Sequence, residues 1–428
     1  MALSVMPATH ANDVLTSVLI DNDNADYQLN EQILQARETA LKILKPTKKQ
    51  LAHGLALHAN SLVFDTYGFM PLAALDGAAI AKAIENNASD LEIRDMKENM
   101  TMTRFVKNDS EREEFKNAWN ASGVTCVFQN AGESGNEIYR MVKRLAHFTY
   151  ATDMMGGFVS RAVVPEDIVR AKKENRHCLY FSANGVPLPQ DWVSLEEELR
   201  FIEIFFQLGM RMMHLTYNRR NVIGDGCAET ANGGLSDFGR AVVKEMNRVG
   251  VIVDIAHSGW QTSLEAAQVS DKPIVASHSS VAAIYPHFRS KPDHVIKAIA
   301  DKGGYVGICC VPEFLRGSGD IASMMNHIDY MVKKFGPEYV GIGTDVAYRS
   351  SFTDKERAKI PTVRPARVRW IALWPEDKFV ITPEMGQSMS WTNWPLFTVG
   401  LVQMGYSDTD IQKILGGNAI RVARAAQV

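Results

Sequence analysis

The stretch VIVDIAHSGWQTSLEAAQVSDKPIVASHSS, residues 251 to 280, decides the fold. It contains two short apolar runs, one closing at His257 and the other at His278. Such runs are typical of buried parallel strands, and the segment between them has the length and pattern of a crossover helix. The strands of a parallel barrel end at one mouth, so both imidazoles are expected there, where they suit a divalent metal such as zinc. Either histidine alone is also typical of a hydrogen-bonded loop residue, so it is the matched pair that indicates a metal site.

The rest of the chain extends this pattern to eight apolar runs that alternate with helical segments. They cover residues 61–65, 123–128, 177–181, 211–216, 251–255, 273–276, 304–311 and 340–344. Eight such units predict an α/β fold of the (β/α)8 TIM-barrel type. Helical spacing predicts an N-terminal helical arm over 30–57 and C-terminal helices within 396–425. We expect residues 1–58 to be an arm and helix that pack on the barrel, and residues 59–428 to be one catalytic barrel with a C-terminal helical extension.

Composition narrows the class of protein. The formal net charge is −3, and the chain has no dense basic run beyond Lys45 to Lys49, which argues against a nucleic-acid partner. Five cysteines without CxxC spacing argue against a disulfide framework and favour a reducing, cytoplasmic location. Residues 1 to about 28 are polar and are expected to form an arm. They have the pattern of neither a signal peptide nor a membrane span.

The second half carries five motifs in a fixed order. They are GLSDFGRAVVKEMNRVGVIVDIAHSG, IVASHSSVAAI, HFRSKPDHVIKAIADKGGYVGI, HIDYMVKKFGPEYVGIGTDV and GYSDTDIQKILGGNAIRV. Together they resemble the membrane (renal) dipeptidase family of the amidohydrolase superfamily, whereas the first half matches only loosely. The resemblance implies a zinc-dependent hydrolase that acts on a small molecule and forms a homodimer.

The resemblance also implies roles for single residues. His257 and His278 stand where the family has the two histidines of one zinc site. Arg289 stands at the arginine that pairs with a substrate carboxylate, a task suited to its bidentate fork. Asp345 stands at the aspartate that takes a proton from the attacking water and passes one to the leaving nitrogen. From its own context, Asp345 is also a candidate helix N-cap.

The departures from the family are equally informative. After the first strand the family has Asp-Gly-His-Asn-Asp, whereas Tyr67 and Phe69 occupy the positions of its metal-binding histidine and aspartate here. Asn184 stands in place of a bridging glutamate, and an amide is a weak metal ligand. Tyr217 replaces a histidine that orients the substrate and the tetrahedral intermediate. The binuclear site is therefore degenerate, and we expect about one zinc per chain with the second site lost.

These assignments predict a metal-dependent hydrolase of a small amide or dipeptide-like substrate. Asp345 would shuttle the proton, and Tyr217 or Tyr67 would stabilise the oxyanion. Arg289, Tyr67 and Asn184 would bind substrate, and either Asp345 or Asp65 would complete the metal's ligands. The alternative is non-peptidase chemistry, such as a lyase, isomerase or deaminase acting on a small aromatic or biosynthetic molecule, with one metal or none. A silent scaffold is disfavoured, because such a protein has no physical need for an aspartate facing two imidazoles.

A few residues are expected to be structural. His214 is interpreted as a satisfied core histidine, and Cys309 and Cys310 as core side chains. Four tryptophans of the late insertion fit either an aromatic substrate pocket or plain packing. These are Trp370, Trp374, Trp391 and Trp394.

Overall fold

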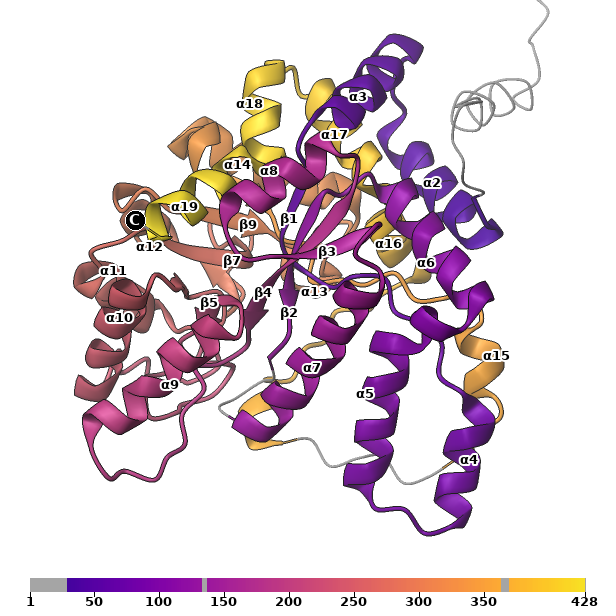
Figure 1. Cartoon of the computed structure of the whole chain (residues 1–428). Helices are drawn as coiled ribbons and strands as arrows, with labels where there is room; N and C mark the ends of the chain where they lie inside the picture. The colour runs from indigo at the N-terminus through magenta and orange to yellow at the C-terminus, as the bar shows by residue number, and fades with distance from the viewer. Residues whose placement is uncertain (1–28, 133–136, 363–368, 428) are drawn as a thin grey trace, which may run out of the picture.

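The computed structural model describes residues 29–132, 137–362 and 369–427. Eight parallel strands form a nearly closed barrel with helices around it (Figure 1). They are β1 Phe64–Gly68, β2 Cys126–Asn130, β4 His177–Ala183, β5 Met210–His214, β6 Ile252–Asp254, β7 Ile274–Val281, β9 Tyr305–Ile308 and β10 Val340–Ile342, paired in that order. The predicted TIM-type barrel is confirmed. The expected arm at residues 1–28 lies outside the described residues.

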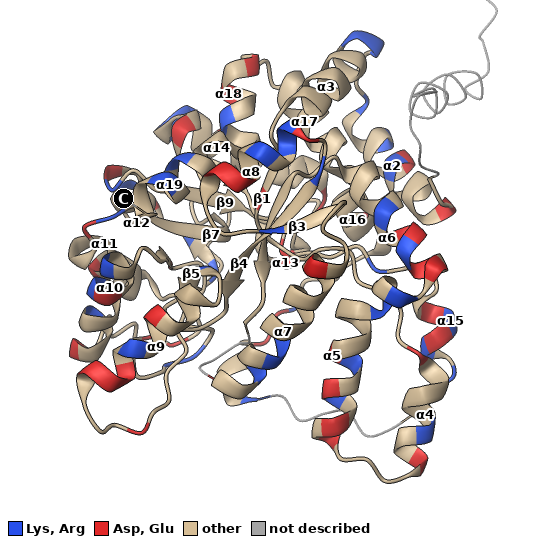
Figure 2. Ribbon diagram, viewed as in Figure 1, with Lys and Arg blue, Asp and Glu red and all other residues tan. Residues whose placement is uncertain are grey.

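The helices are arranged around the strands as the βα pattern predicts (Figure 1). The N-terminal pair is α2 Glu31–Leu44 and α3 Lys48–Asn60, separated at Pro46, and α3 packs on α17. In order, the others are α4 Gly77–Glu85, α5 Asp90–Lys107, α6 Asp109–Ser122, α7 Ile138–Met154, α8 Pro165–Lys173, α9 Leu195–Gln207, α10 Asp237–Val249, α11 Trp260–Val269, α12 Asp293–Asp301, α13 Pro312–Leu315, α14 Ile321–Phe335, α15 Thr353–Arg357, α16 Pro383–Ser388, α17 Trp394–Gln403, α18 Asp408–Gln412 and α19 Asn418–Gln427. Figure 2 shows charges of both signs interspersed along these helices.

Two short strands were not predicted. β3 Val159–Ala162 pairs with β4, and β8 Ser290–Lys291 pairs with β7. The pairing with β8 extends β7 to Val281, so His278 lies inside its strand and not at the predicted end. A register shift in β7 between Ala276 and Ser279 accompanies this extension. Such an irregularity changes the direction of side chains along a strand. It lets His278 share the lumen with Val275, although an offset of three positions would place them on opposite faces of a regular strand.

The barrel closes through side chains at the seam between β1 and β10, which stand at opposite ends of the paired order. The Asp65 carboxylate accepts hydrogen bonds from the Thr344 backbone N–H at 2.9 Å and from the Thr344 hydroxyl at 2.6 Å. The indole N–H of Trp391 also donates to Asp65, at 3.1 Å. Just beyond Asp65 and Thr344 along the chain, the Asp345 N–H donates to the Tyr67 carbonyl at 3.0 Å. Asp65 is therefore a structural carboxylate of the seam.

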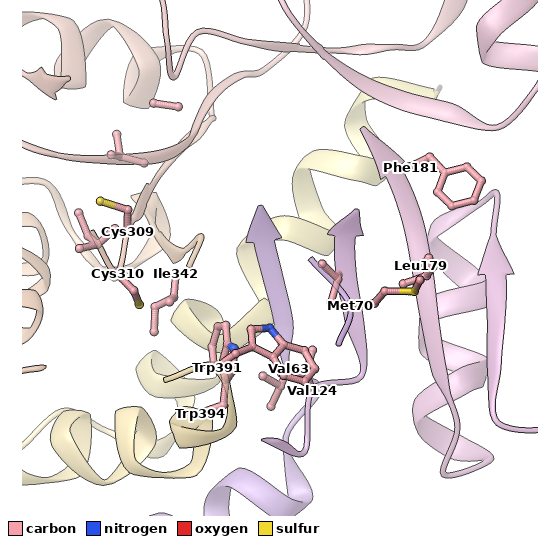
Figure 3. Packing of buried hydrophobic residues seen from close by; sticks show 14 of the residues in the cluster. Val63, Met70, Val124, Leu179, Phe181, Cys309, Cys310, Ile342, Trp391 and Trp394 are labelled. Atoms are coloured by element: carbon pink, nitrogen blue, oxygen red, sulfur yellow. The ribbon is translucent and has the colours of Figure 1, made fainter. Parts of the chain in front are cut away.

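The hydrophobic core has two parts. The larger part fills the space between the strands and the helices, and Figure 3 shows Trp391 and Trp394 there with Val63 and Val124. Cys309 and Cys310 belong to the same cluster, as predicted, and the chain's five cysteines are all free and buried. The smaller part fills the barrel lumen with aromatic and aliphatic side chains. Within the described ranges, no helix has the length and apolar character needed to cross a membrane.

Candidate active site

The two histidines of the deciding stretch meet in the barrel. His257 follows β6 and His278 lies in β7, and their Nε2 atoms are 3.1 Å apart. Both side chains are buried, at 3% and 0% exposure. The expected convergence is present in the structure, and the role of the pair as metal ligands stays a prediction.

Hydrogen bonds fix the orientation of His257. The Asn218 side-chain N–H donates to the Ala372 carbonyl at 3.3 Å, so the Asn218 Oδ1 atom is the one that faces His257. The Nδ1–H of His257 donates to that oxygen at 2.9 Å, which leaves Nε2 unprotonated with its lone pair directed toward the Nε2 of His278. The Nδ1 of His278 lies 2.9 Å from the Ser277 hydroxyl. Metal-binding imidazoles are typically held through their second nitrogen in this way.

Electrostatics keep both imidazoles neutral. Burial lowers the pKa of His257 and of His278 well below the usual value, and the nearby Arg289 guanidinium lowers both further. A neutral imidazole is the form that binds a metal. Arg289 is itself fully buried and donates hydrogen bonds to the backbone carbonyls of Ala256 and His278. It therefore holds the two histidine segments together. Its predicted role with a substrate carboxylate stays a prediction and would require its remaining N–H groups.

Asp345 lies beside the two histidines at the barrel mouth. One carboxylate oxygen lies 4.0 Å from the Nε2 of His278, and 25% of the side chain is exposed. Burial raises the pKa of Asp345 to about 7, although the charge of Arg289 opposes the shift. Its backbone is left-handed, with φ of +57°, a conformation that aspartate tolerates better than most residues. The N-cap alternative is wrong, because the next helix, α15, has Phe352 at its N-cap position.

Tyr67 and Asn184 bond to each other. The Tyr67 hydroxyl donates to the Asn184 side-chain oxygen, and the Tyr67 ring stacks on His278 at a centroid distance of 3.8 Å. Burial raises the pKa of Tyr67 well above its usual value, and the charge of Asp345 adds to the shift. The phenol therefore stays protonated. Because the Tyr67 hydroxyl and the Asn184 side-chain oxygen bond to each other, neither is a strong candidate for a metal ligand.

Aromatic rings line the other side of the histidine pair. Tyr217 stacks on His257 at 4.1 Å, and Trp374 lies 5.9 Å from the same imidazole. Phe288 and Phe314 follow at 5.4 and 5.7 Å from Trp374. Trp374 therefore joins Tyr217, Phe288 and Phe314 in an aromatic wall beside the histidine pair, whereas Trp391 and Trp394 lie in the packed core. Trp370 lies under the Arg219 guanidinium, 5.0 Å from its ring centroid.

His214 is a core histidine, as predicted, and its polar contact is a buried pair with Asp254. Its side chain is 1% exposed in the lumen, and neither ring nitrogen has a hydrogen-bond partner within the described ranges. Its Nε2 lies 2.6 Å from the Oδ2 of Asp254, at an angle that makes no hydrogen bond. Ligand atoms of His214, Asp254 and His278 lie within 4.8 Å of one another. The overlooked signal was the shared parity of Met212 and His214 along β5, since Met212 faces the lumen.

Comparison with known proteins shows the family to which the chain belongs. The sequence model of membrane dipeptidases, Peptidase family M19, matches residues 51–356. The chain belongs to the membrane dipeptidase family. The protein named dipeptidase tcpJ from Claviceps purpurea is 27% identical over 267 residues, which are 61% of this chain and 54% of that protein. Dipeptidase aclJ from Aspergillus oryzae is 35% identical over 150 residues, covering 34% of this chain and 36% of its own length. The chain thus spans about half the length, or less, of these curated relatives.

A solved structure supports the fold of this membrane dipeptidase family member. The crystal structure of an amidohydrolase from Pseudomonas aeruginosa superposes with a TM-score of 0.64 at 24% identity, covering 87% of this chain and 99% of that one. At that identity the likeness shows the barrel alone. The resemblance found in the sequence is confirmed.

The metal that the family implies fits the donor set of this chain. With metal–nitrogen bonds of about 2.0–2.1 Å, two tetrahedral nitrogen ligands lie roughly 3.3 Å apart, close to the 3.1 Å between His257 and His278. Both imidazoles are neutral, oriented through Nδ1 and buried. His257 and His278 would therefore hold the ion, and Asp345 lies close enough to act on a water beside it.

Proposed function

We propose that this chain is a metal-dependent hydrolase of dipeptide-like amides. The observation that carries the proposal is the pair of converging Nε2 atoms of His257 and His278 with the Asp345 carboxylate 4.0 Å from one of them. Family membership and relatives named as dipeptidases support the same reaction class. They give no support to the alternative of lyase, isomerase or deaminase chemistry.

The bound metal supplies Lewis acidity, which lowers the pKa of water and polarises the scissile carbonyl. The residues of the chain do the rest. Asp345 accepts the proton of the attacking water and returns it to the leaving nitrogen, as the carbonyl carbon gains a bond to oxygen and loses its bond to nitrogen. Tyr217 donates a hydrogen bond to the developing oxyanion. Arg289 attracts an acidic end of the substrate, and Tyr67 and Asn184 border the substrate's place.

The aromatic wall gives the site its substrate preference. Tyr217, Trp374, Phe288 and Phe314 offer apolar faces beside His257. Burial of an aromatic or aliphatic side chain against such rings is favourable because it removes apolar surface from water. Dipeptides with a large apolar side chain are therefore the expected class.

The remaining features of the proposal follow from the resemblance and the composition. We infer one zinc per chain, a homodimer and a cytoplasmic location. We also infer a single catalytic barrel over 59–428 that carries residues 1–58 as an arm and packed helix.

The test combines metal analysis with a substrate panel. The full chain is purified, its metal content is measured by mass spectrometry, and hydrolysis of L,L- and L,D-dipeptides is followed by chromatography before and after chelation and zinc restoration. We expect about one zinc per chain, with activity lost on chelation and regained with zinc. A protein that binds no zinc, or that turns over dipeptides equally well in excess chelator, would contradict the proposal.

A further inference from the structure

The barrel lumen contains buried polar atoms that the proposed reaction does not use. Both ring nitrogens of His214 and the Oδ2 of Asp254 lack a hydrogen-bond partner in the described structure, and both side chains are 1% exposed or less. Leaving a buried polar group unpaired costs on the order of 1–3 kcal/mol, and native proteins rarely do so. The group therefore has unused capacity to bind a partner from outside the chain, beyond the 2.6 Å contact that Nε2 and Oδ2 make with each other.

The orientation of His214 and Asp254 identifies the kind of partner. The two residues are directly opposed in the pairing of β5 with β6. Nε2 and Oδ2 lie 2.6 Å apart, yet they do not point along a hydrogen bond. Two ligand-type atoms that lie side by side can both turn toward one cation, and because ligands of a tetrahedral zinc ion lie roughly 3.3 Å apart, this pair would separate slightly on binding.

The other two histidines of the lumen lie at matching distances. The ring centroid of His214 is 5.3 Å from that of His257 and 5.3 Å from that of His278, and His257 and His278 are 5.0 Å apart. Three imidazoles bound tetrahedrally to one ion, with metal–nitrogen bonds of about 2.0–2.1 Å, have ring centres roughly 5.2 Å apart. The ring spacing is therefore compatible with a three-histidine centre, and the ligand atoms that already lie within 4.8 Å of one another are those of His214, Asp254 and His278.

Asp254 connects the three histidines. Its Oδ1 accepts the backbone N–H groups of Ala256 at 2.9 Å and Ser277 at 3.1 Å, the residues that immediately precede His257 and His278. Its Oδ2 remains beside His214. One carboxylate thus positions both histidine segments and keeps one oxygen available inside the lumen.

Other side chains in the lumen do not compete for the ion. The Tyr67 hydroxyl is bonded to Asn184, and Asp65 is bonded to Thr344 and Trp391 at the seam. We propose that His214 and Asp254 complete the metal centre of His257 and His278, as a third histidine ligand and the carboxylate ligand. This inference rests on the proposed function and refines it, because Asp345 is then left free for proton transfer.

Metal affinity tests the proposal with matched substitutions. Asp254→Asn and Asp345→Asn make the same chemical change at two carboxylates near the histidines, the first buried and the second partly exposed. We expect Asp254→Asn to weaken zinc binding at least about 100-fold, because a lost ligand should cost at least as much as the 10–100-fold typical of an outer-shell partner. Asp345→Asn should bind zinc within a few-fold of wild type. Competition with a chromophoric chelator measures both dissociation constants on the full chain, independently of catalysis.

A second pair of variants covers the histidine. His214→Gln should weaken zinc binding to a similar degree and alter the visible spectrum of the Co²⁺-loaded protein. His327→Gln is the control, because His327 is equally buried but has both ring nitrogens hydrogen-bonded, to the Val281 N–H and the Leu315 carbonyl, each at 3.0 Å. It should keep the wild-type zinc affinity and Co²⁺ spectrum even if the fold is less stable.

The outcomes separate this proposal from the function itself. Wild-type affinity in both Asp254→Asn and His214→Gln, with zinc lost from His257→Ala, would overturn the extended ligand set and leave the proposed function standing. Loss of zinc in Asp345→Asn with retention in Asp254→Asn would assign the carboxylate role to Asp345 and also overturn it. A wild-type protein that binds no zinc would overturn both. Circular dichroism of each variant establishes that it is folded.

Discussion

Two groups of polar residues in the barrel lumen differ in their hydrogen bonding: the pair Tyr67 and Asn184, and the group of His214, His257 and His278. On the β1–β4 side, Tyr67 and Asn184 hydrogen-bond to each other. On the β5–β7 side, His214 has no hydrogen-bond partner in the described structure, and the Nε2 atoms of His257 and His278 face each other. Buried polar groups that satisfy one another need no ligand, whereas unsatisfied ones mark where a ligand belongs. The comparison teaches that the candidate metal ligands of this barrel gather on the β5–β7 side.

The largest expected effect follows removal of a histidine from the β5–β7 side. In His257→Ala or His278→Ala, the zinc dissociation constant should rise by more than about 100-fold, since even outer-shell changes cost 10–100-fold. Dipeptide hydrolysis should fall to background. Mass spectrometry of dialysed protein and a chromatographic assay measure the two effects. If either variant keeps its zinc, the division between the two groups is wrong.

Asp345 provides the next test, because it lies beside the metal-binding side without being one of its proposed ligands. Asp345→Asn should lower kcat by about 10²–10⁴-fold, the range typical of general acid–base catalysis, with zinc retained.

The pH dependence of kcat/KM gives a further test of Asp345. Burial raises the pKa of Asp345 to about 7, so the ionised form that accepts a proton is lost as the pH falls through that value. A bound cation favours the carboxylate and moves the midpoint lower. The kcat/KM of the wild type should therefore rise with pH through a midpoint at or below about 7 and then level off, and Asp345→Asn should lack that rise. An unchanged profile in the variant would assign the proton transfer elsewhere.

On the β1–β4 side, Tyr67→Phe should leave zinc affinity unchanged. The substitution leaves the buried Asn184 oxygen without its donor, which should lower the free energy of unfolding by about 1–3 kcal/mol. Adding Asn184→Leu to Tyr67→Phe should recover part of that loss, because both polar groups are then gone. Urea denaturation monitored by circular dichroism measures the cycle. Loss of zinc in Tyr67→Phe would make the tyrosine a ligand and break the comparison.

The smallest effect concerns a satisfied buried histidine far from the site. His58 accepts from the Thr398 hydroxyl and donates to the Ser122 carbonyl, each at 2.8 Å. Burial lowers its pKa from 6.5 to about 4, so the unfolded chain takes up the proton first and stability is lost as the pH falls from about 6.5 toward 4. Between pH 7 and 5.5 this loss is about 1 kcal/mol. His58→Gln should reduce the pH dependence of unfolding by that amount, and an unchanged dependence would show that His58 does not titrate as burial requires.

The sequence predicted the architecture because each barrel strand is a short apolar run, and burial on both faces requires such runs. It also predicted that His257 and His278 meet, since consecutive strands of a parallel barrel share a mouth. It did not predict the bond between Tyr67 and Asn184 or the pairing of His214 with Asp254, which depend on the register between strands and on shifts within β1 and β7. Apolar periodicity carries no information about these offsets.

The seam between β1 and β10 determines when during folding the site is assembled. Asp345 is held by a backbone bond to Tyr67, and the Asp65 carboxylate joins Thr344 across 279 positions of the chain. The residue assigned to proton transfer thus takes its place only when the first and last strands meet. A chain still emerging from the ribosome, or one opened at this junction, would have the histidines but lack the proposed base, so the proposed hydrolysis would require the closed barrel.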